Sequence, residues 1–377
     1  MSSPRILFAA NSFDVIGGAE TSVLPWLDEA ASRGCEIEFV LCRIRGRRAD
    51  LLESRGIPVH FHRLYDHARG IDIPRLSGIL GLARLLRKGR YDVLVGLQPP
   101  SHYFLRLAAF FSGVNPCPRI VTIEQGSYAD RSYLYVTLDR LFQSRTDCFL
   151  SVSETLRTEF LTRSGVPFAK ATAIPHGIAP KDDRPPDPKL AADAKGRQVI
   201  GCVARISVGK RQRLLVEAVR RIAMKTGRRP LLLLAGDAEE DPGFAGEIAA
   251  AGLSEDVRVL GHRDDIDAIY PLFDVFVLPS VVEGFGLVWA EAMAHGIPVI
   301  TTRIAPMTEF ITDGVNGLLF DVDDVEALED CLRRLLEDTD LRERLGRAGK
   351  AYVRERFRPE TQRRKYVDAF LGTGASL

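Results

Sequence analysis

Two glutamates stand eight positions apart in EGFGLVWAE, residues 283 to 291: Glu283 precedes a Gly-Phe-Gly turn and Glu291 follows it. On one continuous helix their side chains would lie about 80° apart, because each residue turns roughly 100°. Gly284 and Gly286 favour a turn, so we expect Glu283 in a loop and Glu291 one turn inside a helix. This arrangement predicts a ligand held where a strand passes into a helix.

The backbone of the same stretch suits a phosphate. The amides from Phe285 to Val288, Gly286 and Leu287 included, would form the N-terminus of a helix, which binds anions through its free N–H groups. Glu283 could bind sugar hydroxyls or stabilise positive charge at an anomeric carbon, and the carboxylate of Glu291 suits the two hydroxyls of a ribose. Alternatively, Glu291 has no ligand, and its charge only interacts favourably with the positive end of the helix dipole. Such an interaction stabilises a helix by about 0.3 to 1 kcal/mol. That alternative does not explain the upstream glutamate and glycines.

Two cations follow another apolar run, QVIGCVA, residues 198 to 204. Arg205 and Lys210 at the carboxyl end of a strand can clamp a diphosphate and stabilise the charge of a leaving phosphate. Because Arg211 and Arg213 come next, a solvated basic turn is an equally good interpretation.

Consecutive glycines, Gly17 and Gly18, come after the first apolar run and precede an amphipathic segment. They would let backbone N–H groups approach an anion at a helix start. The alternative is a flexible turn in which Glu20 serves the helix dipole. The pattern is not GxGxxG, and no acidic residue closes a second strand, which argues against an NAD-dependent dehydrogenase.

The elements that must position these residues are short apolar runs separated by helix-type segments. The runs are nearly continuous in apolar residues, as parallel strands covered on both faces should be. We therefore expect βαβ units and open parallel sheets. The predicted strands are residues 5–10, 37–42, 59–64, 92–97, 119–124 and 147–153, then 198–204, 231–236, 257–261, 275–279 and 297–302.

The series breaks at residues 175–198, which are rich in proline and charge and predict a linker. We expect an α/β protein with two doubly wound, Rossmann-like domains, residues 1–180 and 181–357, facing a cleft. A C-terminal helix within 358–377 is expected to pack back on the first domain. Ligands of such sheets bind beyond the carboxyl ends of the strands, where the candidate residues lie.

Composition limits the classes of protein. The chain has 377 residues, 46% hydrophobic and 27% charged, with a net charge of +1, and does not predict nucleic-acid binding. Its six cysteines lack C-x-x-C spacing, so neither disulfides nor a zinc site is expected and a cytoplasmic location is predicted. The basic amphipathic segment 73–90 either covers a sheet or lies on the inner face of the cell membrane.

EGFGLVWAE resembles the E-x7-E motif of retaining glycosyltransferases of the GT-B fold, family 4. The resemblance covers nearly the whole chain and is most specific in the second half. Further segments occur in the family's order: GGAE at 17–20, SVSETLRTEF at 151–160, IPHGI at 174–178, ARISVGK at 204–210, LLLLAGD at 231–237, VLGHRDD at 259–265 and DGVNGLLF at 313–320. His176 stands where asparagine is usual.

The resemblance implies a nucleotide-diphospho-sugar donor, a UDP- or GDP-sugar, bound mainly by the C-terminal domain. It places Arg205 and Lys210 at the diphosphate, Glu291 at the ribose and Glu283 near the donor sugar. The resemblance also implies that a phosphate binds the amides of Phe285, Gly286 and Leu287, beside Gly284. It implies that the base contacts Gly261 and His262. Gly17 and Gly18 would contact the phosphates from the first domain. The family needs neither metal nor other cofactor, and no Asp-x-Asp is placed for one.

One position departs from the family. A histidine near the donor sugar is common there, but VTIEQG puts Glu124 in that place. Glu124 is expected to accept a hydrogen bond from a sugar hydroxyl or to influence transition-state charge; a changed donor preference or lost activity are the alternatives. The aromatic and arginine residues of segment 131–145 are expected near the acceptor.

The predicted function is therefore a hexosyltransferase-type glycosyltransferase (EC 2.4). It would move a sugar to a hydroxyl of a glycan or lipid-linked sugar, with retention, in glycan, polysaccharide or glycolipid assembly. The alternatives keep the fold without transfer: a sugar-nucleotide epimerase, or a subunit that binds the donor without reacting.

Overall fold

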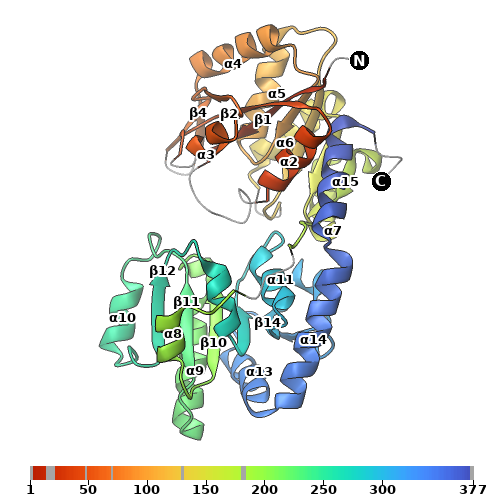
Figure 1. The fold of residues 1–377 in the computed structure, drawn as a ribbon. Coiled ribbons are helices and arrows are strands. Elements are labelled where there is room, and N and C mark those ends of the chain that lie inside the picture. Colours follow the sequence, from red (N-terminus) through yellow and green to blue (C-terminus); the bar gives the residue numbers. More distant parts are fainter. Residues whose placement is uncertain are drawn as a thin grey trace. The chain divides into compact units, whose positions relative to one another are not determined.

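The computed structural model describes residues 3–13, 22–46, 49–68, 71–128, 131–179 and 184–373. The chain divides into two compact units (Figure 1). Unit 1 comprises Met1–Gly177 and Pro359–Leu377, and unit 2 comprises Ile178–Arg358. Gly177 lies against Pro359, so the two segments that connect the units run side by side: a Cβ on Gly177 would approach the Pro359 Cα to 2.6 Å.

Unit 1 is built on a parallel sheet with the strand order β3-β2-β1-β6-β7-β8-β9. An antiparallel hairpin, β4-β5, stands apart from it. The strands are β1 Arg5–Ala10, β2 Glu36–Leu41, β3 Val59–Phe61, β4 Tyr65–Ala68, β5 Ile71–Pro74, β6 Val93–Gly96, β7 Arg119–Glu124, β8 Cys148–Ser151 and β9 Ala171–Ala173. The helices are α2 Leu24–Ser32, α3 Ala49–Ser54, α4 Leu76–Gly89, α5 Ser101–Ser112, α6 Tyr133–Phe142, α7 Glu154–Ser164 and α15 Pro359–Leu371.

The central strand β1 shows why the apolar runs are continuous. Successive side chains of a strand point to opposite faces of the sheet. Ile6 and Phe8 enter one core cluster with Trp26 of α2 and Phe370 of α15. Leu7 and Ala9 enter the other cluster, which holds residues of α4 and α5. Both faces of the strand are therefore covered, and both need apolar residues. Figure 1 shows α2 and α15 side by side.

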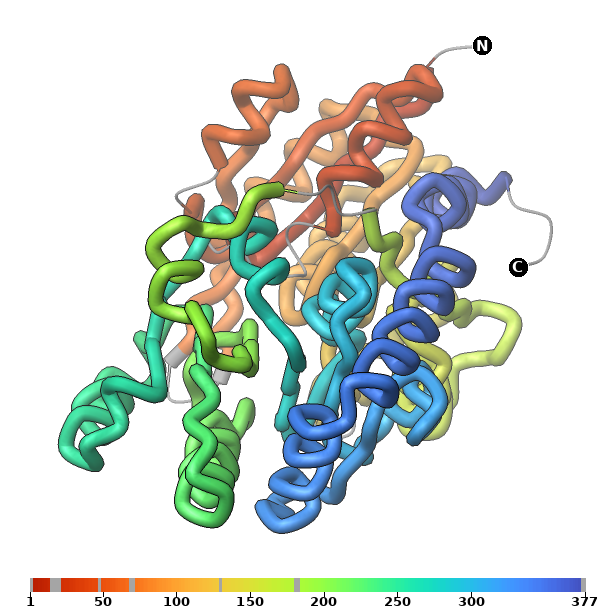
Figure 2. The backbone as a smooth tube through the Cα atoms, turned by 60° about the horizontal axis from the view of Figure 1, so that its bottom comes forward, coloured from red at the N-terminus to blue at the C-terminus, as the bar shows by residue number. Residues whose placement is uncertain are grey.

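Unit 2 repeats this architecture with the strand order β12-β11-β10-β13-β14-β15, all parallel. In Figure 2 the backbone of this unit runs from green to blue in the order of the sequence. The strands are β10 Val199–Val203, β11 Leu231–Ala235, β12 Val257–Gly261, β13 Val275–Leu278, β14 Val299–Thr302 and β15 Leu318–Phe320. The helices are α8 Pro188–Asp193, α9 Gln212–Thr226, α10 Phe244–Ala250, α11 Leu287–Ala294, α12 Met307–Phe310, α13 Val325–Glu337 and α14 Thr339–Arg356.

The predicted fold class, two doubly wound parallel-sheet α/β domains, is confirmed. Each predicted run contains a strand, but four strands were not predicted: β4, β5, β9 and β15. These have only three or four residues, and β4, of sequence YDHA, is largely polar. The helix predicted within 358–377 is α15, which Pro359 starts after α14 has ended at Arg356.

Candidate functional site

The candidate residues of unit 2 follow the carboxyl ends of its parallel strands. Arg205 and Lys210 come after β10, Gly261 and His262 end and follow β12, and Glu283 follows β13. Because β12, β11, β10 and β13 are neighbours in one parallel sheet, their carboxyl ends lie along one edge. The topology thus gathers residues as far apart in sequence as Arg205 and Glu283 along a single edge.

Lys210 and Glu283 meet at this edge. The Lys210 Nζ lies 2.6 Å from the Glu283 Oε1, and the two side chains are only 23% and 9% exposed. Their loops are also tied through the backbone, because the N–H of Val281 donates to the carbonyl of Gly209 at 3.0 Å. The loop after β10 and the loop after β13 are therefore held together, and a cation stands beside the carboxylate.

The glycine turn that follows Glu283 requires glycine at one position. Gly286 has φ of +73°, and an added Cβ would lie 3.1 Å from the Trp289 Cδ1. This left-handed residue starts α11 without a side-chain cap. Trp289, whose Nε1 donates to the carbonyl of Phe285 at 2.6 Å, is fully buried and fixes the turn. The first amides of α11, at Leu287 and Val288, lack the intrahelical partners that later residues have.

Glu291 lies inside α11, as predicted from the glycine positions. The Tyr270 hydroxyl donates to the Glu291 Oε2 at 2.9 Å. Burial and the nearby Glu291 carboxylate raise the pKa of Tyr270 well above its usual value, so the hydroxyl stays protonated and remains a donor. Tyr270 orients the carboxylate, and sequence reasoning missed it because it lies 21 residues upstream with no motif around it.

Arg205, Gly261 and His262 are placed at the edge but are not joined to the Lys210–Glu283 pair. The Arg205 side chain is 59% exposed and pairs with Glu240. The carbonyl of Gly261 accepts a hydrogen bond from the N–H of Gly236 at 2.8 Å, and the His262 side chain is 42% exposed. Gly17 and Gly18, predicted to contact phosphates, lie outside the described residues.

Glu124 ends β7 in unit 1, but its side chain is buried rather than open to a ligand. It is only 2% exposed, and its two oxygens lie 3.0 Å from the His102 Nε2 and 2.8 Å from the Arg131 Nη2. Burial alone would raise the pKa of Glu124, but Arg131 and His102 outweigh it and hold the pKa below its ordinary value. Glu124 is thus an ionised anchor for Arg131.

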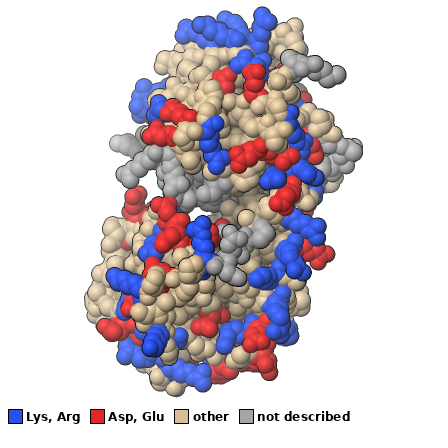
Figure 3. Space-filling model, in the orientation of Figure 1, with Lys and Arg blue, Asp and Glu red and all other residues tan. Residues whose placement is uncertain are grey.

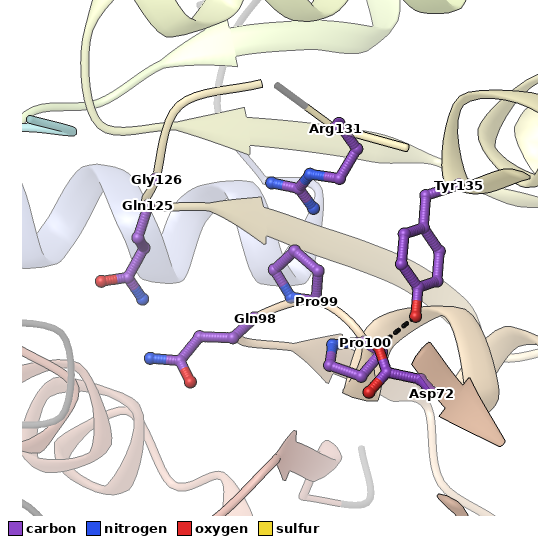
Figure 4. A pocket seen from close by; sticks show the side chains of 8 residues that line it. All are labelled: Asp72, Gln98, Pro99, Pro100, Gln125, Gly126, Arg131 and Tyr135. Atoms are coloured by element: carbon purple, nitrogen blue, oxygen red, sulfur yellow. Dashed lines mark hydrogen bonds between the residues drawn. The ribbon is translucent and has the colours of Figure 1, made fainter. Parts of the chain in front are cut away.

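A pocket of ≈ 450 Å³ opens beside this anchor, at the carboxyl ends of β6 and β7 (Figure 4). The Arg131 guanidinium extends into it, and Tyr135 donates its hydroxyl to Asp72. Both Arg131 and Tyr135 belong to the segment expected near the acceptor. The lining residues are Asp72, Gln98, Pro99, Pro100, Gln125, Gly126, Arg131 and Tyr135.

A buried carboxylate fixes the helices behind the pocket. Asp139 of α6 accepts hydrogen bonds from the hydroxyls of Tyr103 and Tyr128 at 2.9 and 2.7 Å, and pairs with Arg106 at 2.6 Å. Arg106 and Asp139 are almost fully buried. The network joins α5 and α6, so the helix that follows Arg131 has a defined position. Sequence inspection could not find it, because its members are dispersed over residues 103 to 139.

No group of three or more His, Cys, Asp or Glu side chains suited to a metal ion occurs among the described residues. Within the same part of the chain, none of the helices combines the length and apolar character needed to cross a membrane.

Comparison with known proteins decides the family. The family model described as "Glycosyl transferases group 1" matches residues 183–352, and that described as "Glycosyltransferase Family 4" matches residues 16–182. The chain is a family 4 glycosyltransferase. Among its relatives is the lipopolysaccharide core biosynthesis glycosyltransferase LpsE of Rhizobium meliloti, 27% identical over 96% of each chain.

Solved structures agree with this GT-B glycosyltransferase fold. A glycosyltransferase from Rickettsia africae superposes with a TM-score of 0.83 at 19% identity, over 99% of each chain. The Anabaena protein HepE, solved in complex with UDP-glucose, has a TM-score of 0.80 at 21% identity, covering 98% of this chain and 99% of that one. The family 4 assignment and the predicted GT-B fold are confirmed.

Proposed function

We propose that this family 4 glycosyltransferase transfers a sugar from a UDP- or GDP-sugar to an acceptor hydroxyl, with retention of anomeric configuration, in polysaccharide or glycolipid assembly. The observation that carries the proposal is the Lys210–Glu283 pair at 2.6 Å beside the glycine turn that starts α11. A cation, a carboxylate and free helix amides at one edge suit a diphosphate joined to a sugar. The complex of HepE with UDP-glucose and the role of LpsE in lipopolysaccharide synthesis support it.

In the proposed reaction, the acceptor oxygen attacks the anomeric carbon on the face from which the diphosphate leaves. The bond between that carbon and the phosphate oxygen breaks, and the leaving diphosphate takes the acceptor's proton. Lys210 stabilises the charge on the leaving group, with Arg205 available from the same loop, as preorganised cations do in other phosphate sites. Glu283 holds Lys210 and binds the donor sugar's hydroxyls.

The remaining donor contacts are proposed on the same basis. Glu291, oriented by Tyr270, binds the ribose hydroxyls. The backbone at Gly261 and His262, and the amides of Phe285, Gly286 and Leu287 beside Gly284, complete the nucleotide site. We propose that no metal takes part, since side-chain cations and helix amides supply the positive charge.

The buried position of Glu124 changes the role that we propose for it. One oxygen of the buried carboxylate pairs with Arg131 and the other lies 3.0 Å from the His102 ring, so we propose that Glu124 acts through Arg131 rather than by touching a ligand. It is a positioning residue, in contrast to the direct contact expected from the sequence.

Incubation with labelled UDP-, GDP- and ADP-sugars tests the proposal. Transfer predicts that nucleoside diphosphate is released only with an added acceptor, and that the product keeps the donor's anomeric configuration. An isomerised donor would identify an epimerase, and binding without either product would identify a non-catalytic subunit. Either of these results would overturn the proposed transfer.

We further propose that unit 1 contacts the inner face of the cell membrane through α4. The helix turns Ile79, Leu82 and Leu86 into the core, which leaves a basic face outside. Figure 3 shows Lys and Arg side chains gathered over the part of unit 1 where α4 lies. The exposed cations are Arg75, Arg84, Arg87, Lys88 and Arg90, and Leu76 is 65% exposed beside them. Such a face is attracted to anionic lipid.

A further inference from the structure

The turn before α11 carries one large side chain, that of Phe285, between Gly284 and Gly286. Glycine restricts the backbone less than any other residue, so the two glycines permit this turn but do not fix it. Phe285 is only 2% exposed, and its ring is therefore inserted into the interior of unit 2. The position of the turn's amides depends on what packs around this ring.

Three aromatic rings surround Phe285. Its ring centroid lies 5.4 Å from that of Trp289, 5.0 Å from that of Phe310 and 5.5 Å from that of Phe357. The contacts with Phe310 and Phe357 are edge-to-face, an arrangement that is favourable and depends on ring orientation. Trp289 belongs to α11 itself, whereas Phe310 ends α12 and Phe357 follows α14. Two rings from outside α11 thus support the turn.

Helix α14 packs along α11 and carries Phe357 to the start of that helix (Figure 1). A Cβ on Gly346 would lie 2.1 Å from the carbonyl oxygen of Gly296, just after α11, and one on Gly349 would lie 2.9 Å from the Met293 Cγ. Glycine at both positions lets the two helices approach closely. Contacts made by successive residues of α14 therefore run from the end of α11 towards its start, where Phe357 packs.

Phe357 is itself held in place, so it can act as a support. It is only 2% exposed, and Tyr352 of α14 packs on its ring with centroids 5.7 Å apart. Its N–H donates to the carbonyl of Val353 at 2.9 Å, and its carbonyl accepts from the N–H of Ile178 at 2.8 Å. Ile178 begins unit 2 and Phe357 lies at its other end. The turn is therefore supported from the place where the chain enters and leaves unit 2.

We infer that Phe357 is a positioning residue for the donor's phosphate: through the ring of Phe285 it sets where the amides of the glycine turn and of Leu287 lie. The inference rests on the proposed function, because it assumes that these amides bind a donor phosphate. Donors must be held within about 0.5 Å of the productive geometry for a site to work. Because Phe357 acts on the turn, its loss should weaken the binding of phosphates and spare that of the nucleoside.

The test compares UDP and GDP with their nucleosides, uridine and guanosine, on the full-length protein. Isothermal titration calorimetry gives the dissociation constants of the diphosphates, and saturation-transfer NMR titration gives those of the nucleosides. For the diphosphate that binds the wild-type protein more tightly, Phe357→Leu should weaken binding about tenfold. The same variant should change the affinity for the matching nucleoside by no more than about twofold, since a nucleoside has no phosphate to contact the turn.

Phe310→Leu removes the other ring that supports the turn from outside α11, and it should give the same selective loss. This second variant tests the same support if Phe357→Leu does not fold. Phe320→Leu is the matched control, because Phe320 is a buried phenylalanine of unit 2 that packs in the core cluster of α9 and α13. The control should keep both affinities within about twofold of wild type. Circular dichroism verifies that the variants fold.

Two results would overturn the inference: unchanged diphosphate binding in the folded variants, or an equal loss of diphosphate and nucleoside binding, which would leave Phe357 with a role in the fold alone. Sugar transfer by the wild-type protein separates these results from the proposed function. If transfer occurs without the selective loss, the role of Phe357 is wrong and the proposed function stands. If the selective loss occurs without transfer, the reverse holds. If neither diphosphate binds the wild-type protein, both are wrong.

Discussion

At the scale of single residues, the Lys210–Glu283 pair is the contact on which the proposed donor site depends. Both side chains are mostly buried, and they lie 73 positions apart in sequence. The pair holds the Glu283 carboxylate and the Lys210 ammonium side by side at the edge of the sheet. Arg211, the next cation along the chain, instead pairs with the exposed Asp323 and does not take part.

Removing the charge of Lys210 or Glu283 should lower turnover strongly while the protein stays folded. We expect Lys210→Ala and Glu283→Gln each to reduce kcat about 10²- to 10³-fold, the usual effect of losing one preorganised charge. Arg211→Ala is the matched control and should stay within about twofold of the wild-type kcat, because its partner is exposed. Steady-state transfer assays measure kcat, and thermal unfolding verifies folding. Wild-type kcat in both site variants would remove Lys210 and Glu283 from the mechanism.

At the scale of elements, α15 completes the core of unit 1 although it comes last in the chain. Tyr366 of this helix stacks on Trp26 of α2 with ring centroids 4.0 Å apart, and its hydroxyl donates to the carbonyl of Ile174 at 2.5 Å. The ring of His176 lies 6.0 Å from that of Trp26 and 6.3 Å from that of Tyr366, nearly parallel to both, and His176 is only 4% exposed. Burial lowers the pKa of His176 to about 3.

This burial predicts that acid weakens unit 1. Between about pH 6.5 and 3 the unfolded chain binds a proton at His176 that the folded chain does not, so stability falls as pH falls through this window. His176→Asn removes the group. On going from pH 7 to pH 5, the wild-type protein should therefore lose about 2 kcal/mol more free energy of unfolding than the variant does.

Urea unfolding followed by Trp26 fluorescence measures the effect. Trp26 and Trp289 are the two tryptophans, so a Trp289→Phe background isolates the signal of unit 1. His262→Asn, a change at an exposed histidine of unit 2, provides the control. If the difference between wild type and His176→Asn does not change with pH, the buried histidine does not set the acid sensitivity.

At the scale of the whole molecule, the two units differ in the chemical groups at their candidate binding sites. Unit 2 places cations and helix amides along the edge of its sheet, whereas unit 1 has the pocket with Arg131 and Gln125. Unit 1 also carries the basic face of α4 (Figure 3). Its exposed cations lie on a helix whose apolar side is already used in the core, so membrane binding would be mainly electrostatic.

That electrostatic contact predicts a salt-sensitive association with anionic vesicles. Wild-type protein should float with vesicles of phosphatidylcholine and phosphatidylglycerol at low salt, and Arg84→Glu with Lys88→Glu should reduce the bound fraction about tenfold or more. Arg333→Glu with Arg347→Glu, the same charge change at exposed positions of unit 2, should have little effect. Failure of the wild-type protein to float would end the membrane proposal.

Features that depend on residues close together in the sequence could be predicted from the sequence, and contacts between distant segments could not. Continuous apolar runs specified the principal strands, because a parallel strand covered on both faces needs apolar side chains at every position. The glycines of EGFGLVWAE specified the turn before α11, since Gly286 occupies a conformation that suits glycine. The strands β4 (YDHA) and β5 (IDIP) were not predicted because polar residues interrupt their apolar ones. The strands β9 (ATA) and β15 (LLF) were not predicted because three residues outside a longer apolar run leave too weak a pattern.

Only the tertiary structure decided which side chains meet. Nothing in the sequence pairs Glu124 with His102 and Arg131, yet these contacts turn an apparent ligand group into a buried anchor. The pairing of Tyr270 with Glu291, and the meeting of Asp72, Gln125 and Arg131 at one pocket, likewise depend on chain segments brought together by the sheets. Local sequence fixes backbone conformation and burial, whereas contacts between distant segments arise only when the strands are ordered in the sheet.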